Sequence, residues 1–107
     1  MNPYDAAHQL IRSIKDSMEY KTYQDVKTLL ESNEKQSNMV KDFQQKQWDL
    51  QQKAMMGQEP GETEMQALRQ LYDIITIDPQ VKHFLEAEMR FMLLMEDVQK
   101  IIGDGLV

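Results

Sequence analysis

Few side chains in this sequence have types and spacing that could support chemistry. The two histidines, His8 and His83, share no ligand spacing, and His83 has only Glu86 as a carboxylate on its own helix face. Cysteine is absent, which excludes thiolate nucleophiles, disulfides and Cys-bound metal centres. The glycine-rich and nucleophile-elbow motifs of common enzymes are also missing. We therefore expect no catalytic residue, no metal ligand and no cofactor, and predict that the protein is not an enzyme.

Glu88 is the one ionisable residue at a position where burial is expected. It lies on the apolar stripe of the last helix, where an unpaired carboxylate would cost several kcal/mol. Two interpretations follow: a polar group at an interface, or a structural ion pair with an arginine of another helix, such as Arg12 or Arg69. We favour the ion pair, which can also fix register or oligomeric state.

Methionine and tryptophan indicate surfaces that could bind a protein. The chain has nine methionines and one tryptophan. Met89, Met92 and Met95 could form an adaptable binding face, but we favour a core position, because methionine fills irregular gaps. Exposure is expected for the methionines beside a loop. Trp48 either anchors a protein interface, since tryptophan is enriched at hot spots, or closes the edge of the core. The predicted partner surface consists of Trp48, Gln51, Met55 and Met56.

These residues must be positioned by helices, because apolar residues recur every three or four positions and no segment alternates as a strand does. Asn2 and Pro3 are typical of a helix start, and Ser17 predicts a restart after the first helix. The Gly57–Gly61 segment is the clearest loop. The expected helices cover about 3–17, 18–30, 34–56, 63–77 and 79–102, with Asp78 as a cap and Gly103 as the last stop. Thr63 is a possible cap of the fourth helix, and Glu62 and Glu64 also suit its start through the helix dipole.

The last helix carries the strongest signal, a 4-3-4-3-4 stripe. Its members are Phe84, Glu88, Phe91, Met95, Val98 and Ile102. Helices over 34–56 and 79–102 would each be about 35 Å long, comparable with the diameter of a compact domain of this size. We therefore predict an all-α, elongated bundle of four to five helices. Because such a bundle leaves apolar surface wet, the stripe is assigned to the core or to self-association in a homodimer.

Length, charge and hydropathy further restrict the class of protein. The length of 107 residues suits a single helical domain. The 18 acidic and 12 basic residues give a net charge of −6, which argues against nucleic acid as a partner. The sequence has no apolar run of membrane-spanning length and no secretion signal at its start. We expect a cytoplasmic protein that does not associate with membranes.

Three stretches resemble the YlbF/YmcA family, particularly its YheA-like branch. These are QWDLQQK at 47–53 followed by MMGQE at 55–59, LEAEMRF at 85–91 followed by Met95 and DVQKIIG at 97–103, and the opening at 2–7 with Glu19-Tyr20-Lys21. Met89 replaces the glutamine that the family usually has. The resemblance implies an all-helical, usually dimeric bacterial protein. Relatives act in competence, sporulation and biofilm formation, in a complex that modulates ribonuclease Y and can carry iron–sulfur clusters. Without cysteine this chain cannot supply cluster thiolates.

The leading hypothesis is a small cytosolic interaction or adaptor protein that self-associates and has a regulatory role. A protein partner of the ribonuclease Y type is implied by the resemblance only. One alternative is an RNA-processing accessory that contacts RNA directly, but its lysines along the first three helices are interleaved with acids. A small-molecule-binding protein is the third hypothesis, and the sequence shows no set of polar residues that would define its pocket.

Overall fold

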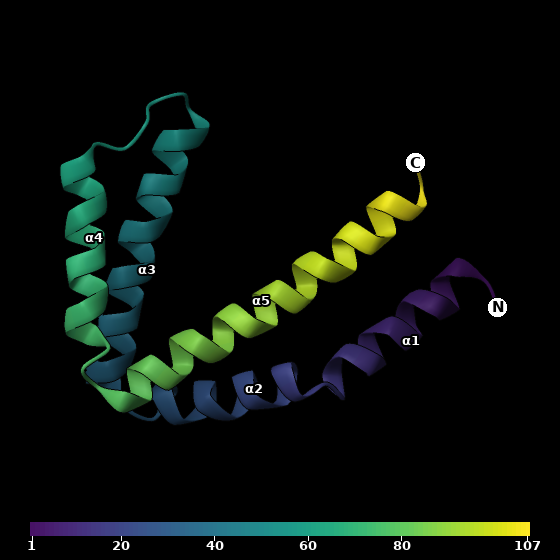
Figure 1. The fold of residues 1–107 in the computed structure, drawn as a ribbon. Helices are drawn as coiled ribbons and strands as arrows, with labels where there is room; N and C mark the ends of the chain where they lie inside the picture. Colours follow the sequence, from purple (N-terminus) through teal and green to yellow (C-terminus); the bar gives the residue numbers. More distant parts are fainter. The chain divides into compact units, whose positions relative to one another are not determined.

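The computed structural model describes residues 1–107 and consists of helices joined by turns and one loop (Figure 1). The five helices are α1 (Pro3–Lys15), α2 (Met18–Glu31), α3 (Glu34–Met55), α4 (Glu62–Ile75) and α5 (Pro79–Gly105). The all-α prediction is confirmed, and α3 and α5 are the two long helices expected over 34–56 and 79–102.

Local side-chain chemistry explains most helix starts. The Asn2 side chain accepts a hydrogen bond from the backbone N–H of Asp5 at 2.8 Å, and Pro3 occupies the first turn of α1. Ser17 separates α1 from α2: its Oγ donates to the Ile14 carbonyl at 2.6 Å and accepts from the Tyr20 N–H at 3.2 Å. The predicted restart at Ser17 is confirmed.

Two expected boundaries are wrong. Thr63 does not cap α4, which begins at Glu62 with Gly61 before it and without a side-chain cap. Acidic residues Glu62 and Glu64 in the first turn interact favourably with the helix dipole instead. Gly103 does not stop α5, which continues to Gly105. Gly57 is the residue with positive φ, at 81°, so Gly103 does not adopt the left-handed conformation by which glycine ends a helix.

The structure divides into two compact units, each described separately. The terminal unit comprises Met1–Thr28 and Phe84–Val107, and the hairpin unit comprises Leu29–His83. The single domain expected over residues 1–107 remains a prediction.

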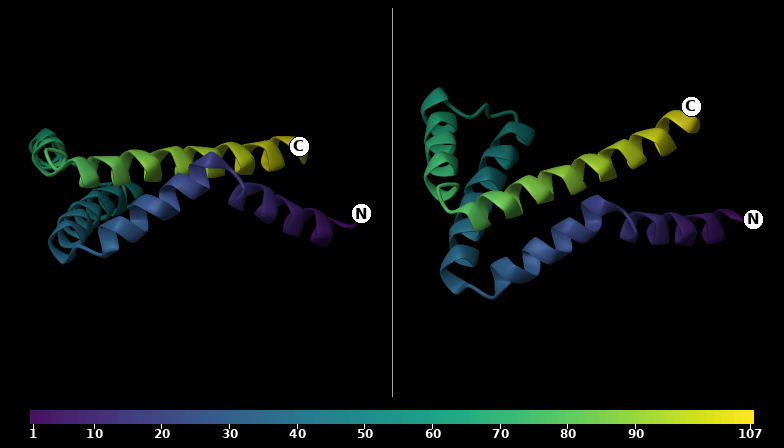
Figure 2. Two further views of the ribbon diagram at one scale, coloured as in Figure 1. Left: turned by 90° about the horizontal axis from the view of Figure 1, so that it is seen from below. Right: turned by 60° about the horizontal axis from the view of Figure 1, so that its bottom comes forward.

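The terminal unit has an aromatic core between α2 and α5. The Phe91 ring lies 5.2 Å from the Tyr23 ring and 5.5 Å from the Tyr20 ring, centroid to centroid, and Tyr23 also meets Phe84 at 5.8 Å. Such pairs contribute about 0.5–1.5 kcal/mol each beyond the burial of their area. Toward the chain ends, α1 and the C-terminal half of α5 lie apart (Figure 1), and the views of Figure 2 show them diverging.

The hairpin unit is formed by α3 and α4, and its core lies at one end of the hairpin. Phe43 and Tyr72 pack with ring centroids 5.7 Å apart, near the buried side chains of Val40 and Ile75. The two helices separate toward the loop that joins them (Figures 1 and 2). The packing of this hairpin therefore weakens along its length.

Asp78 joins two elements of the hairpin unit. One carboxylate oxygen accepts from the Gln80 N–H at 2.9 Å and from the Val81 N–H at 3.4 Å, which caps α5 as predicted. The other accepts from the Gln36 side-chain amide of α3 at 2.9 Å. The hydrogen bond from Gln36 is the main cause that lowers the Asp78 pKa below its ordinary value of 3.8, against a raising effect of desolvation.

This lowered pKa predicts a pH-dependent contribution to stability. Because the folded state binds the Asp78 proton more weakly than the unfolded chain, the contribution is complete above pH 3.8 and is lost as the pH falls below that value. In thermal unfolding followed by circular dichroism, Asp78→Ala should have a lower Tm than the natural protein at pH 7, and the difference should shrink below pH 3.8. Asp78→Asn keeps a capping oxygen without titrating. An equal loss of Tm on acidification in Asp78→Asn and the natural protein would contradict the assignment.

Candidate functional site

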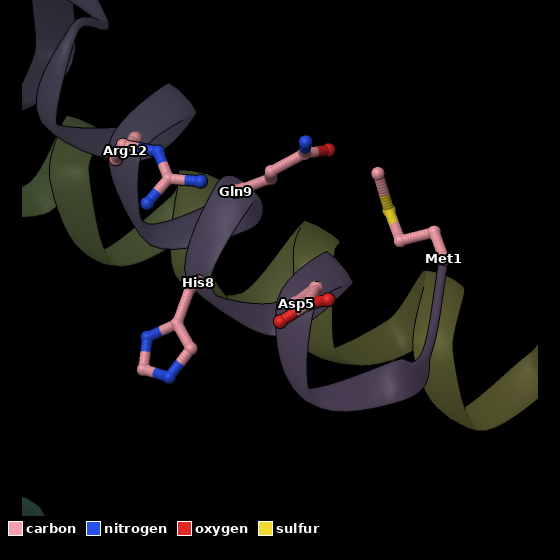
Figure 3. A pocket seen from close by; sticks show the side chains of 5 residues that line it. All are labelled: Met1, Asp5, His8, Gln9 and Arg12. Atoms are coloured by element: carbon pink, nitrogen blue, oxygen red, sulfur yellow. The ribbon is translucent and has the colours of Figure 1, made fainter.

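The first candidate is a site formed by ionisable side chains. No group of three or more His, Asp or Glu side chains lies where it could hold a metal ion. The hollow near the N-terminus is bordered by side chains of Met1 and of α1 alone, namely Asp5, His8, Gln9 and Arg12. Figure 3 shows these side chains fanning out from one helix instead of converging on a common point. The two histidines are both exposed.

The candidate site is therefore a set of surfaces, the first of which lies in the terminal unit. The predicted α5 stripe begins in the core and ends at the surface. Phe84 is buried, Glu88, Phe91, Met95 and Val98 are half-buried, and Ile102 is 49% exposed. The aromatic rings of α2 contact its beginning, and its C-terminal end is only partly covered.

A second stripe on α1 behaves in the same way. Tyr4, Ala7, Ile11 and Ile14 recur at a spacing of three and four residues. Ile14, nearest α2, is buried, Ile11 is 49% exposed, and Tyr4 near the chain start is largely exposed. Both stripes thus lose their cover toward the chain ends. The sequence analysis assigned none of these α1 residues to a site.

The predicted core position of the α5 methionines is wrong for two of three. Met89 and Met92 are exposed, whereas Met95 is half-buried. Met92 borders the stripe, whereas Met89 and the exposed Leu93 lie further round α5, more than a quarter of a helical turn from the stripe's centre. The 4-3 spacing of the stripe already distinguishes Met95 from Met89 and Met92.

The predicted partner surface lies in the hairpin unit. Trp48, Gln51, Met55 and Met56 are all exposed near the loop end of α3, as expected for the two methionines. Trp48 and Met55, seven residues apart, lie on one side of the helix with Gln51 between them. Whether this surface and the α5 stripe bind proteins remains a prediction.

These features define an all-α protein of amphipathic helices whose apolar side chains are partly left at the surface. None of the five helices combines the length and apolar character required to cross a bilayer.

Comparison with known proteins gives the family. A family model described as "Control of competence regulator ComK, YlbF/YmcA" matches residues 4–107. The chain therefore belongs to the YlbF/YmcA family, as its motifs predict.

Its relatives carry a family designation that names no enzymatic activity. A UPF0342 protein of Caldicellulosiruptor bescii is 37% identical over 105 residues, which cover 98% of this chain and 88% of the relative. A UPF0342 protein of Halothermothrix orenii is 39% identical over 103 residues, covering 96% and 87%. One from Shouchella clausii is 30% identical over 105 residues, covering 98% and 89%.

The hairpin unit predicts opposite roles for two aromatic residues of α3. Phe43 is 6% exposed and Trp48 is 55% exposed. Phe43→Ala should destabilise the protein by about 3–5 kcal/mol, because it leaves a cavity beside Tyr72. Trp48→Ala should change the free energy of unfolding by less than about 1 kcal/mol. Urea unfolding followed by circular dichroism measures both, and a loss of similar size in the two variants would place Trp48 in the core.

Proposed function

We propose that this protein is a self-associating regulatory adaptor that forms a homodimer through the terminal unit and has no enzymatic activity. The supporting observation is the loss of cover along the stripes of α1 and α5. The side chains of Ile11 and Ile102 are each about half exposed to solvent, and Ile101 and Leu106, near the end of α5, are also exposed. A second copy of the same unit would supply the missing cover.

Burial of these apolar side chains can contribute enough free energy to stabilise a dimer. Burial of an Ile or Leu side chain stabilises by about 1.5–3 kcal/mol when it is complete. A symmetric pairing buries each residue twice, once in each copy. Several half-exposed residues on two helices can therefore offset the loss of translational and rotational freedom on association, which is about 4–15 kcal/mol.

Stripes with a spacing of three and four residues also suit helix–helix pairing, because they present a continuous seam to a partner helix. Glu88 lies on the α5 seam and is half-buried. A carboxylate in such a seam disfavours registers that leave it without hydrogen bonds. Because Glu88 lies between Phe84 and Phe91, in the part of the stripe that α2 covers, we assign it the role of fixing the register of α5 within its own unit.

The family supports a regulatory role. The description of its model refers to control of a competence regulator, which is a regulatory task. We extend this role to the present chain and place it in the cytoplasm. A ribonuclease Y-type complex is the protein partner that the resemblance suggests. The net charge of −6 disfavours direct RNA binding as the main activity.

Ile102→Glu tests self-association. The substitution places a charge in the uncovered end of the α5 stripe, so it should weaken the dimer at least about tenfold, equivalent to ~1.4 kcal/mol. Sedimentation equilibrium over a range of concentrations measures the dissociation constant, and circular dichroism verifies the helical content.

Lys100→Gln is the matched control, because it changes the net charge by the same amount on the opposite face of α5. It should leave the dissociation constant unchanged. A natural protein that sediments as a monomer at all concentrations would refute the homodimer, and equal weakening by both substitutions would exclude the stripe as its interface.

A further inference from the structure

The hairpin unit contains a hollow that neither the α5 stripe nor its own core uses. It has a volume of about 540 Å³ and lies between α3 and α4 near their connecting loop. Its apolar walls are Leu50 and Ala54 of α3 and Met65 and Leu68 of α4. Gln47 and Gln51 border it on α3, and Glu59 and Pro60 of the loop border it at its end. We call this hollow the hairpin groove.

The groove residues form one face on each of the two helices. On α3 they occupy positions 47, 50, 51 and 54, which is one continuous face over two turns, and on α4 they are one turn apart. Ala54 has a small side chain and allows a docked backbone to approach closely. The groove thus runs along the hairpin and has the form that an amphipathic helix fills with its apolar face.

Adaptable and aromatic side chains extend this surface. Gln51 belongs both to the groove and to the exposed side of α3 that carries Trp48 and Met55. Met65, in the groove wall, is 42% exposed. Methionine side chains adapt to varied partners, and tryptophan is enriched among residues that dominate binding energy. These are the properties of a protein-binding surface.

The charge at the groove's loop end identifies the partner's chemistry. The segment 57–64 contains three glutamates and no lysine or arginine. Lys53 neutralises one of them, because its Nζ lies 2.9 Å from Oε1 of Glu64. Glu59 and Glu62 have no such ion pair. A cationic side chain that docks here would therefore complement the carboxylates of Glu59 and Glu62.

We propose that the hairpin groove binds a basic amphipathic helix of another protein. This proposal deepens the adaptor part of the proposed function and does not depend on the dimer. Leucine-type residues of the ligand helix occupy the walls formed by Leu50, Ala54, Met65 and Leu68, and its lysine or arginine residues face Glu59 and Glu62.

Trp48 provides a direct readout, because it is the single tryptophan and lies beside the groove at 55% exposure. The probe is a synthetic Leu/Lys amphipathic helix of about 18 residues, which spans about 27 Å. Its counterpart is a Leu/Glu helix with the same apolar face. Titration of the full-length protein with the Leu/Lys peptide should shift the emission of Trp48 to shorter wavelength and saturate, and the Leu/Glu peptide should not bind.

Two variants that add the same positive charge locate the binding site. Ala54→Arg fills the groove and should weaken binding of the Leu/Lys peptide by about tenfold or more. Gln70→Arg lies on the exposed face of α4 outside the groove and should leave the affinity unchanged. Glu59→Gln should weaken binding less than Ala54→Arg does, and its effect should disappear at high salt.

Three outcomes would overturn the proposal. These are equal binding of both peptides, equal affinities of Ala54→Arg and Gln70→Arg, and an emission of Trp48 that shifts on dilution of the protein alone, which would show a second copy in the groove. Sedimentation of the same samples separates this test from the dimer, because Ala54→Arg should leave the oligomeric state unchanged.

Discussion

The structure depends on one constraint: α1 and α5 carry apolar stripes that a single copy covers only in part. The aromatic contacts of Tyr20 and Tyr23 with Phe91 hold the beginning of the α5 stripe. Beyond these contacts α1 and α5 diverge (Figure 2), and the side chains of Ile11 and Ile102 are exposed to solvent. Since exposed apolar area is unfavourable in proportion to its size, the terminal unit gains free energy by acquiring cover. This is the basis on which we propose that the terminal unit associates with a second copy.

The hairpin unit follows the same rule independently. Near Phe43 and Tyr72 its two helices bury their apolar faces against one another, and near the loop they separate and leave a groove. The groove ends at an acidic loop, whereas the exposed end of the α5 stripe contains isoleucines. One chain can thus offer one surface to its own kind and another to a basic partner, which is the basic requirement of an adaptor.

Sequence reasoning predicted what local chemistry determines. Asn2, Ser17 and Asp78 start helices because their side-chain oxygens accept backbone N–H groups within four residues. It failed where local signals were weak, as at Thr63 and Gly103. It could not identify which part of a stripe is covered, or the groove itself, because both depend on where two helices meet. The exposure of Met89 and Met92, by contrast, is consistent with their positions outside the 4-3 stripe.

Hydrogen exchange at several protein concentrations tests the central claim most directly. If a second copy covers the stripes, amides of α1 and of the C-terminal half of α5 should become more protected as concentration rises through the dissociation constant. Amides around Phe43 and Tyr72 in the hairpin core should show no such change. Protection of α1 and α5 that is independent of concentration, in a protein that remains monomeric, would contradict the account.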